Sequence, residues 1–390
     1  MAIEGRSEKA EGPIRLGMVG GGQGAFIGGV HRIAARMDGE FQLVAGALSS
    51  DPQRARASAA ELGLDPERSY GSFQEMAKAE AKRGDGIEAV AIVTPNHMHF
   101  APAKAFLEAG IHVICDKPLT SSLADAKKLQ AIVENTGKVF VLTHNYTGYP
   151  MIRQAREMVA KGQLGDIRVV QAEYPQDWLT TNIETTGQKQ ASWRTDPKRS
   201  GVGGSTGDIG THAYNLARFV TGLELDSLAA DLDSFVEGRQ LDDNAHVLLR
   251  FKSGAKGMIW ASQVAPGNEN GLKLRVYGTK GGLEWTQADP NYLWYTPFGE
   301  PKRLLTRAGA GAGPAAARVT RVPSGHPEGY LEGFANIYAE AARAIRAARR
   351  KGGKLPKDVV FPTVYDGVEG VAFVEACVKS SKKNGAWTKL

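Results

Sequence analysis

The chain has 390 residues, of which 42% are hydrophobic and 23% charged, with a formal net charge of +6. This length exceeds what one core usually holds, so two domains are expected, and the composition excludes a disordered or fibrous protein. The basic residues are scattered except at 343–354 and lack interleaved aromatic residues, so no nucleic-acid partner is expected. No apolar run approaches 18 residues, so no membrane-spanning segment is expected.

The cysteine count and the N-terminus bear on the compartment. Cys115 and Cys377 are the only cysteines, too few for a disulfide framework, which favours a reducing environment. Residues 1–12 are polar and contain no apolar core of a signal peptide, so we interpret them as a flexible N-terminus. We therefore expect a cytoplasmic protein.

The first third of the chain alternates apolar runs with helical patterns. Helical periodicity follows each apolar run, and no tight hairpin joins neighbouring runs, which is typical of a parallel, doubly wound sheet. We expect an α/β fold with a Rossmann dinucleotide-binding domain at 13–147. The expected strands are 14–20, 41–49, 87–95, 112–118 and 139–145, and the expected helices are 25–37, 51–63, 72–81, 100–110 and 122–137.

After about residue 148 the pattern changes to extended, alternating segments. The sequences "KSG" and "TKGG" are hairpin signals, so the segments should form a large, mostly antiparallel sheet with one face covered. Helical patterns return at 328–350 and 363–383. We expect a second α/β domain at 148–390 for substrate binding and oligomerisation. Its C-terminal helices either stay within this domain or pack back on the first domain.

A glycine-rich stretch, "MVGGGQGAFIG", follows the first strand and opens the first helix. Read as G-x-G-x-x-A, it places small residues where backbone N–H groups can approach a pyrophosphate at a helix N-terminus. The alternative is a glycine-rich turn without a ligand, but the position at the first strand-to-helix turn favours a dinucleotide. The expected contacts are Gly20, Gly22, Gln23, Gly24, Ala25, Phe26 and Ile27.

The end of the second expected strand lacks the acidic residue that usually binds the adenosine ribose of NAD. Ser49 and Ser50 stand there instead, and Asp51 is expected to cap the next helix. With Arg54 nearby, these hydroxyls could receive a 2′-phosphate, although Arg54 is equally compatible with an ordinary surface position. The sequence leaves NAD and NADP open.

Polar residues also follow the later strands, where ligands of doubly wound sheets gather. The spacing of His97 and His99 raises a metal site as an alternative, but a metal would need further convergent ligands, and none is predicted. Lys117, locked against Pro118, faces the same crevice, where a cation would stabilise a developing alkoxide; the alternative is a lysine that reaches solvent. The further cofactor contacts expected here are Thr94, Pro95, Asn96, His97, Asp116, Lys117 and Asn145.

A second candidate centre lies at 201–222, where a glycine-rich loop is expected to lead into a helix ended by Gly222. Asp208 and His212 are four residues apart and so share one helix face. A carboxylate beside an imidazole supplies an acceptor for substrate hydroxyls and a group that titrates near neutrality. The alternative is a helix-capping aspartate and a packed histidine.

The glycine loop, "TPNHMH", "CDKP" and "GDIGTH" together resemble the Gfo/Idh/MocA oxidoreductases, over nearly the whole chain from Ile14. The resemblance implies a Rossmann domain and a mixed-sheet domain whose open face makes a homodimer or homotetramer. It implies catalytic roles for Lys117, Asp208 and His212. The chain departs from the family at Asp116, where the family has Glu, and in the missing acid after the second strand.

The resemblance implies an NAD(P)-dependent dehydrogenase that oxidises a secondary hydroxyl of a sugar, sugar derivative or cyclitol. His212 would take the hydroxyl proton, Lys117 would bind the same oxygen and Asp208 would orient a neighbouring hydroxyl, while the formal base stays open between Lys117 and His212. One alternative is a glycoside-cleaving enzyme that works by transient oxidation at C3 and elimination; another is a non-catalytic sugar or cofactor sensor. The substrate contacts expected, each with a structural role as its alternative, are Lys117, His144, Tyr146, Gln176, Trp178, Trp193, Arg194, Asp208, His212 and His326.

Overall fold

The computed structural model describes residues 12–350 and 353–390, so the expected flexible N-terminus lies outside the described residues except for Gly12. The described chain divides into two compact units. One, here called the parallel-sheet unit, runs to Asn145 and includes Tyr330–Val368. The other, the nine-strand unit, consists of Tyr146–Gly329 and Glu369–Leu390. The expected domain boundary at residue 147 stays a proposal.

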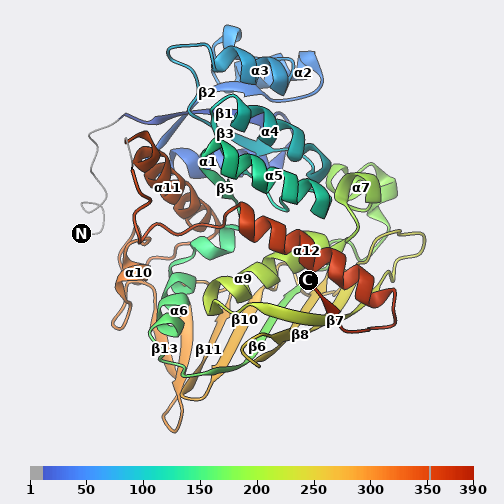
Figure 1. The fold of residues 1–390 in the computed structure, drawn as a ribbon, viewed down its shortest axis with the longest axis vertical. Coiled ribbons are helices and arrows are strands. Elements are labelled where there is room, and N and C mark those ends of the chain that lie inside the picture. The colour runs from blue at the N-terminus through green and yellow to red at the C-terminus, as the bar shows by residue number, and fades with distance from the viewer. Residues whose placement is uncertain (1–11, 351–352) are drawn as a thin grey trace. The chain divides into compact units, whose positions relative to one another are not determined.

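The parallel-sheet unit is built on five parallel strands in the order β2-β1-β3-β4-β5 (Figure 1). Helices connect the strands in sequence, which confirms the expected doubly wound sheet. The strands are β1 (Ile14–Gly20), β2 (Phe41–Ala47), β3 (Ala89–Val93), β4 (His112–Cys115) and β5 (Phe140–Leu142). The helices are α1 (Phe26–Met37), α2 (Pro52–Glu61), α3 (Phe73–Glu80), α4 (Phe100–Glu108), α5 (Leu123–Thr136) and α11 (Tyr330–Arg349), with short 3₁₀ turns at Pro66–Arg68 and Asn96–Met98.

Both faces of this sheet are covered by helices, and alternate residues of each strand point to one face or the other. On one face Leu16 and Met18 are fully buried in a core that includes Phe334 and Tyr338 of α11. On the other face Gly17 lies so close to α3 that an added Cβ would stand 2.2 Å from Met76 Cε. The strands are therefore buried on both sides, and only their ends can offer side chains to a ligand.

The nine-strand unit has the strand order β13-β12-β11-β10-β6-β9-β8-β7-β14. Every neighbouring pair is antiparallel except β6 and β9, which confirms the expected large, mostly antiparallel sheet. The strands are β6 (Ile167–Pro175), β7 (Leu225–Asp233), β8 (Asn244–Phe251), β9 (Lys256–Ser262), β10 (Lys273–Gly278), β11 (Gly281–Thr286), β12 (Tyr292–Pro297), β13 (Arg303–Thr306) and β14 (Thr388–Lys389).

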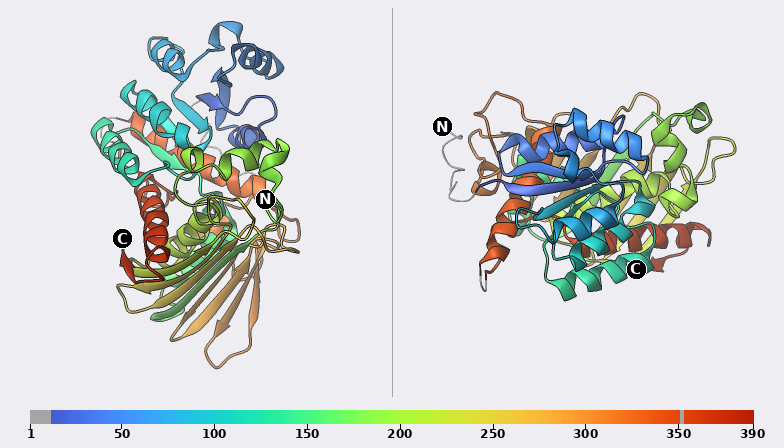
Figure 2. Two further views of the ribbon diagram at one scale, coloured as in Figure 1. Left: turned by 90° about the vertical axis from the view of Figure 1, so that its right-hand side faces the viewer. Right: turned by 90° about the horizontal axis from the view of Figure 1, so that it is seen from above.

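Helices cover one face of this sheet and leave the other open (Figure 2). On β8, Val247 and Leu249 are buried under the helices, whereas Leu248 between them is 55% exposed. Tyr214 of α9 stacks on Phe373 of α12 at 4.3 Å between ring centroids. The helices are α6 (Pro150–Ala160), α7 (Lys189–Arg194), α8 (Pro197–Ser200), α9 (Thr211–Thr221), α10 (Pro314–Ala317) and α12 (Val364–Ser381), whose first turn belongs to the parallel-sheet unit, with 3₁₀ turns at Asn145–Gly148 and Ile183–Thr186.

None of the helices in the described part of the chain combines the length and apolarity that crossing a bilayer would need.

Candidate active site

The glycine loop between β1 and α1 fits a dinucleotide pyrophosphate. Gly20, Gly21 and Gly24 have φ values of 79°, 74° and 74°, a region that residues with a Cβ rarely adopt. Helix α1 begins at Phe26 with no side-chain cap and no acidic residue in its first turn. Its first amide groups and the positive end of its dipole therefore suit an anion.

The segment after β2 is arranged around Asp51, which caps α2 as expected. Asp51 Oδ1 accepts a hydrogen bond of 2.8 Å from the Arg54 amide, and Ser49 Oγ accepts one of 3.1 Å from the Asp51 amide. Arg54 and Ser50 are exposed at this end of the helix. The Asp51 carboxylate is thus engaged in the cap, and the site still leaves NAD and NADP open.

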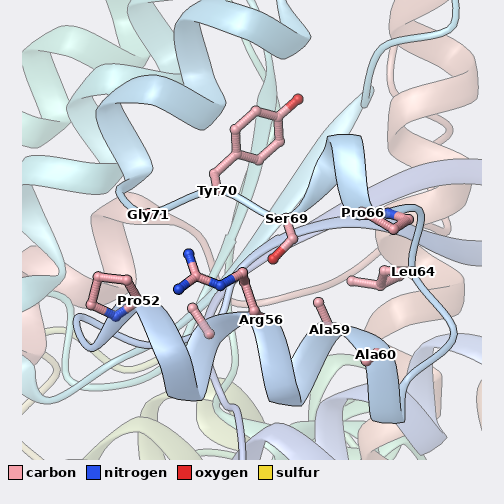
Figure 3. A pocket seen from close by; sticks show the side chains of 10 residues that line it. Pro52, Arg56, Ala59, Ala60, Leu64, Pro66, Ser69, Tyr70 and Gly71 are labelled. Carbon is pink, nitrogen blue, oxygen red and sulfur yellow. The ribbon is translucent and has the colours of Figure 1, made fainter.

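A pocket of about 280 Å³ lies beside α2, on the side of the helix that faces away from the glycine loop, and is lined by Pro52, Arg56 and Tyr70 among others (Figure 3). Ser58, on the opposite side of the helix, faces the glycine loop, since its hydroxyl accepts a 3.0 Å hydrogen bond from the Gln23 amide. The pocket is therefore separate from the dinucleotide loop.

His99 joins the ends of β3 and β4. Its Nδ1 lies 2.7 Å from the Pro118 carbonyl oxygen and its Nε2 lies 2.8 Å from that of Thr94. Both ring nitrogens face backbone oxygens, which argues against metal ligation by this residue, while His97 is exposed. Over the described ranges, no three His, Cys, Asp or Glu side chains gather as a metal site would require.

Lys117, the second residue after β4, is half-buried, and the Lys117–Pro118 peptide bond is cis. Asp116 Oδ1 accepts hydrogen bonds of 2.9 Å from the Lys117 amide and from Thr143 Oγ1, so the carboxylate ties the ends of β4 and β5 together. Burial, with the nearby charge of Lys117, lowers the pKa of His144 to about 3. His144 is therefore neutral at pH 7, and so low a pKa makes it too weak a base for general base catalysis there.

Asn145, at the end of β5, is 3% exposed, and its Nδ2 has no hydrogen-bond partner among the described residues. A buried amide donor without a partner costs on the order of 1–3 kcal/mol, so it fits a site where a bound ligand supplies the acceptor. Together with the glycine loop, this donor supports the fit of a nicotinamide dinucleotide to the parallel-sheet unit.

In the nine-strand unit, the helix that carries Asp208 and His212 begins at Ser205, earlier than the sequence predicts. The Asp242 carboxylate accepts from the amides of Gly204 (2.7 Å) and Thr206 (2.8 Å), so it caps the helix and makes the glycine-rich segment helical. Thr206–Gly210 forms a π-helical turn, and the Asp208 amide donates to the Gly204 carbonyl. Asp208 is therefore not the cap, so the helix-capping part of that alternative is wrong.

Asp208 is held by two donors on its Oδ2, Arg194 Nε at 3.1 Å and Gln263 Nε2 at 2.9 Å. The Arg194 guanidinium carbon lies 4.4 Å from the centroid of the Trp193 ring and 6.0 Å from that of Trp178. Four expected substrate contacts, Trp178, Trp193, Arg194 and Asp208, thus form one connected group.

His212 is 7% exposed and lies against two tyrosines. Its ring centroid is 4.9 Å from that of Tyr146 and 6.1 Å from that of Tyr174, both in edge-on geometry. Burial raises the pKa of Tyr146, and the negative charge of Asp208 adds to the rise. Tyr146 is therefore in contact with the imidazole of His212 and within reach of the charge of the Asp208 carboxylate.

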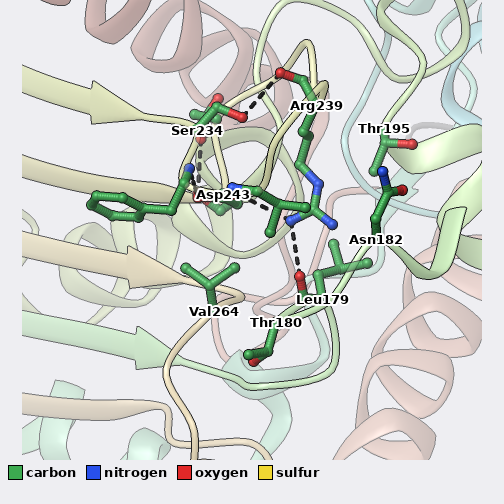
Figure 4. A network of polar contacts seen from close by, with 12 residues as sticks. Leu179, Thr180, Asn182, Thr195, Ser234, Arg239, Asp243 and Val264 are labelled. Atoms are coloured by element: carbon green, nitrogen blue, oxygen red, sulfur yellow. Dashed lines mark hydrogen bonds and ion pairs between the residues drawn. The ribbon is translucent and has the colours of Figure 1, made fainter.

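A buried ion-pair network fixes the chain between Trp178 and Trp193 (Figure 4). Arg239 Nη1 donates to the Leu179 carbonyl at 2.9 Å and to Asp243 Oδ2 at 3.0 Å, and its other nitrogens bind Glu184 at 2.9 Å. The Arg239 side chain is 1% exposed. Breaking such a buried pair is strongly destabilising, so this network holds the segment that carries the tryptophans.

One expected substrate contact stands apart. His326 is exposed, and its backbone carbonyl accepts from the Arg307 guanidinium, so the described contacts do not join its side chain to the Asp208 group. Its role stays a prediction.

Several connecting residues escaped sequence reasoning. The amide-rich stretch "SQVAPGNENG" was a weak signal for two of them, whereas nothing in the periodicity marks the others. They are Tyr174, Arg239, Asp242, Gln263 and Asn270.

Residues 14–146 match the family model for an oxidoreductase family with an NAD-binding Rossmann fold, and residues 152–284 match that for the GFO/IDH/MocA C-terminal domain. The uncharacterised oxidoreductase YfiI of Bacillus subtilis (strain 168) is 38% identical over 381 residues, 97% of each chain.

Solved structures agree with this assignment. An oxidoreductase from Sinorhizobium meliloti is 68% identical, with a TM-score of 0.89 over 97% of this chain and 100% of its own. An inositol dehydrogenase homologue from Azotobacter vinelandii is 40% identical in its complex with NAD⁺, with a TM-score of 0.95 over 98% of this chain and 99% of its own. Its complex with NADH and myo-inositol is 39% identical, with a TM-score of 0.91 over 97% and 98%. The chain belongs to the Gfo/Idh/MocA family, and is an oxidoreductase with an NAD-binding Rossmann domain.

Proposed function

We propose that this enzyme is an NAD(P)-dependent dehydrogenase that oxidises a secondary hydroxyl of a sugar, sugar derivative or cyclitol. The observation that carries the proposal is the connected group of Asp208, Arg194 and two tryptophans, next to the buried imidazole of His212. The relative from Azotobacter vinelandii, whose complex contains myo-inositol, supports the same class of substrate.

The chemistry of the Asp208 group suits a neutral ring with several hydroxyls. The Asp208 carboxylate accepts hydrogen bonds, while Arg194 donates them, so neighbouring hydroxyls of one ring find complementary partners. Trp178 and Trp193 offer flat apolar faces for the C–H side of such a ring. Because Arg194 is already paired with Asp208, the group carries no surplus charge that would select an acidic substrate.

In the proposed reaction, the nicotinamide of the bound cofactor accepts the hydride from the carbinol carbon. His212 takes the hydroxyl proton, and the Lys117 ammonium donates a hydrogen bond to the same oxygen as negative charge develops. Asp208 holds a neighbouring hydroxyl and thereby orients the ring. The assignment requires that Lys117 and His212, which belong to different units, meet at one substrate.

The substitution His212→Ala tests the role of the imidazole. General base catalysis contributes about 100- to 10,000-fold, so turnover should fall by that range. Binding of NADH, followed by its fluorescence, should persist because His212 lies outside the parallel-sheet unit. Unchanged turnover would reject the assignment.

A cofactor-reduction screen of inositols, aldoses and glycosides, with NAD and NADP in parallel, tests the substrate class. Net oxidation gives a rise in absorbance at 340 nm in proportion to product. Glycoside cleavage without that rise would instead indicate transient oxidation at C3, and activity on simple alcohols alone would reject the polyol assignment.

We also propose that a second copy of the chain covers the open face of the nine-strand sheet, as a homodimer or as part of a homotetramer. Leu248 and Met258 are paired on neighbouring strands and are 55% and 39% exposed there. The same row continues through the polar side chains of Gln171, Arg275 and Glu284 to Trp294, which is 41% exposed. Apolar side chains in such a row are typical of an interface between subunits. In sedimentation, the Leu248→Asp variant should therefore have a lower mass than the wild-type assembly. A wild-type protein that sediments as a monomer would contradict the proposal.

A further inference from the structure

The side chain of Asn270, in the segment between β9 and β10, contacts four other side chains. Its Oδ1 accepts hydrogen bonds from the Tyr174 hydroxyl (2.7 Å) and from Gln176 Nε2 (2.8 Å). Its Nδ2 donates to Gln287 Oε1 (3.0 Å) and to the Tyr146 hydroxyl (3.3 Å). A carboxamide has two donor hydrogens and two acceptor lone pairs, so the hydrogen-bonding capacity of Asn270 is fully used.

The direction of these hydrogen bonds is set at one end by Trp178. An indole N–H can only donate, and Trp178 Nε1 donates to Gln176 Oε1 at 3.0 Å. The other end of the Gln176 amide must then donate, so Asn270 presents its oxygen to Gln176 and its nitrogen to Gln287. The orientation of the Asn270 amide is therefore determined by its partners.

The other branch of the network leads to His212. The hydroxyls of Tyr146 and Tyr174 lie 2.5 Å apart, and their rings are nearly perpendicular, at 86°. Both rings stand edge-on to the imidazole of His212, with interplanar angles of 75° and 63°. Asn270 binds both hydroxyls and so fixes the far ends of the two rings that contact His212.

We propose that Asn270 is a positioning residue, which sets the ring of His212 through Tyr146 and Tyr174 and the indole of Trp178 through Gln176. The proposal rests on the function proposed above, because it assigns His212 and Trp178 to the same substrate. One amide thereby aligns the proton acceptor with a surface on which the substrate ring rests. Small errors in such alignment reduce turnover more than they reduce binding.

The substitution Asn270→Ala removes all four hydrogen bonds. Turnover should fall by about tenfold to 100-fold, with a smaller change in KM for the polyol, since misplacing a catalytic group costs up to about 100-fold. The matched control is Asn268→Ala in the same segment, whose amide donates to the Ala265 carbonyl and has no described contact with either tyrosine. This control should keep wild-type turnover.

The substitution Asn270→Asp separates positioning from simple stabilisation. A carboxylate keeps the acceptor for Tyr174 and Gln176, and its second oxygen can accept from a rotated Gln287 amide. The Tyr146 hydroxyl has one hydrogen, so it can donate to this oxygen only in place of its hydrogen bond to Tyr174. Turnover should therefore recover to within about tenfold of wild type. The added negative charge favours the imidazolium form of His212, so the acidic limb of the pH–rate profile should move up by about one pH unit.

The ionisable groups that face His212 in the described contacts are Tyr146 and Tyr174, and the charge of Asp208, which is paired with Arg194, acts on Tyr146; all four are unchanged in both Asn270 variants. Wild-type turnover in Asn270→Ala, or an unshifted acidic limb in Asn270→Asp, would overturn the positioning role. If His212→Ala alone is inactive while both Asn270 variants behave as wild type, only the positioning role fails. If His212→Ala is fully active, the proposed function fails with it.

Discussion

The two units place their candidate residues by different means. In the parallel-sheet unit, backbone features do so: Lys117 is the second residue after β4, and the glycine loop depends on the positive φ of its glycines. In the nine-strand unit, side chains hold one another, as Arg194 and Gln263 hold Asp208. The candidate cofactor residues of the first unit are therefore placed by fold topology, while the candidate substrate residues of the second unit depend on a side-chain network that substitutions can alter.

The largest expected effect comes from substitutions in both units, made singly and together. Lys117→Met and His212→Ala should each lower turnover by about 100- to 10,000-fold if, as proposed, both groups act on one oxygen. The double variant should be much less impaired than the product of the two single effects, since residues that act as a unit are not additive. Steady-state kinetics of the four proteins checks this, and multiplicative losses would indicate independent roles.

A smaller effect is expected within the Asp208 group. Arg194→Met removes a charged hydrogen bond to Asp208, and such bonds contribute about 1.5–3 kcal/mol, so KM for the polyol should rise about tenfold or more. Arg199→Met in the adjacent helix α8 is the matched control and should keep the wild-type KM. A raised KM in both variants would mean that loss of charge, rather than this contact, weakens binding.

A still smaller effect on activity is expected from substitutions of two arginines in α2 of the parallel-sheet unit. Arg54 shares the helix face of Ser58, toward the glycine loop, whereas Arg56 lines the separate pocket of Figure 3. Arg54→Ala should raise KM for NADP by about tenfold and leave KM for NAD nearly unchanged, because only NADP carries a 2′-phosphate. Arg56→Ala should change neither value, and equal effects of the two substitutions would contradict a specific role for Arg54.

The smallest effect on activity, with an effect on stability instead, is expected at His31. Burial lowers the pKa of His31 to about 4, below its ordinary value of 6.5. As the pH falls through this window, the unfolded chain binds a proton before the folded chain does, so stability present above pH 6.5 is lost toward pH 4, by about 3 kcal/mol.

His31→Gln tests this stability term, because glutamine retains an acceptor for the Tyr338 hydroxyl, which lies 2.7 Å from His31 Nδ1. The drop in melting temperature between pH 7 and pH 5 should be smaller in the variant than in the wild type, with turnover at pH 7 unchanged. An equal drop in both proteins would show that His31 does not titrate on unfolding.

The contrast between the units also explains what could be predicted from the sequence. The order of strands and helices in the parallel-sheet unit follows from local periodicity, which is why Lys117 and Asn145 could be assigned to strand ends. The partners of Asp208 and Tyr146 could not be found in this way, because Gln263 and Asn270 lie 55 and 124 residues away along the chain. No period within one element encodes such contacts.

The helix of Asp208 gives a further example. Its glycine-rich start resembles a loop, but the distant carboxylate of Asp242 caps it as a helix. Local propensity was therefore overridden by a tertiary contact, as is common for weak helix formers.

A crystal structure of the enzyme with nicotinamide cofactor and a polyol substrate would test most directly whether the ammonium of Lys117 and the imidazole of His212, from the two units, serve one reacting hydroxyl. We predict that Lys117 Nζ and a ring nitrogen of His212 both lie within about 3.2 Å of the same substrate oxygen. Electron density that places the polyol against only one of these side chains, with the other directed into a different cavity, would contradict this shared role of Lys117 and His212.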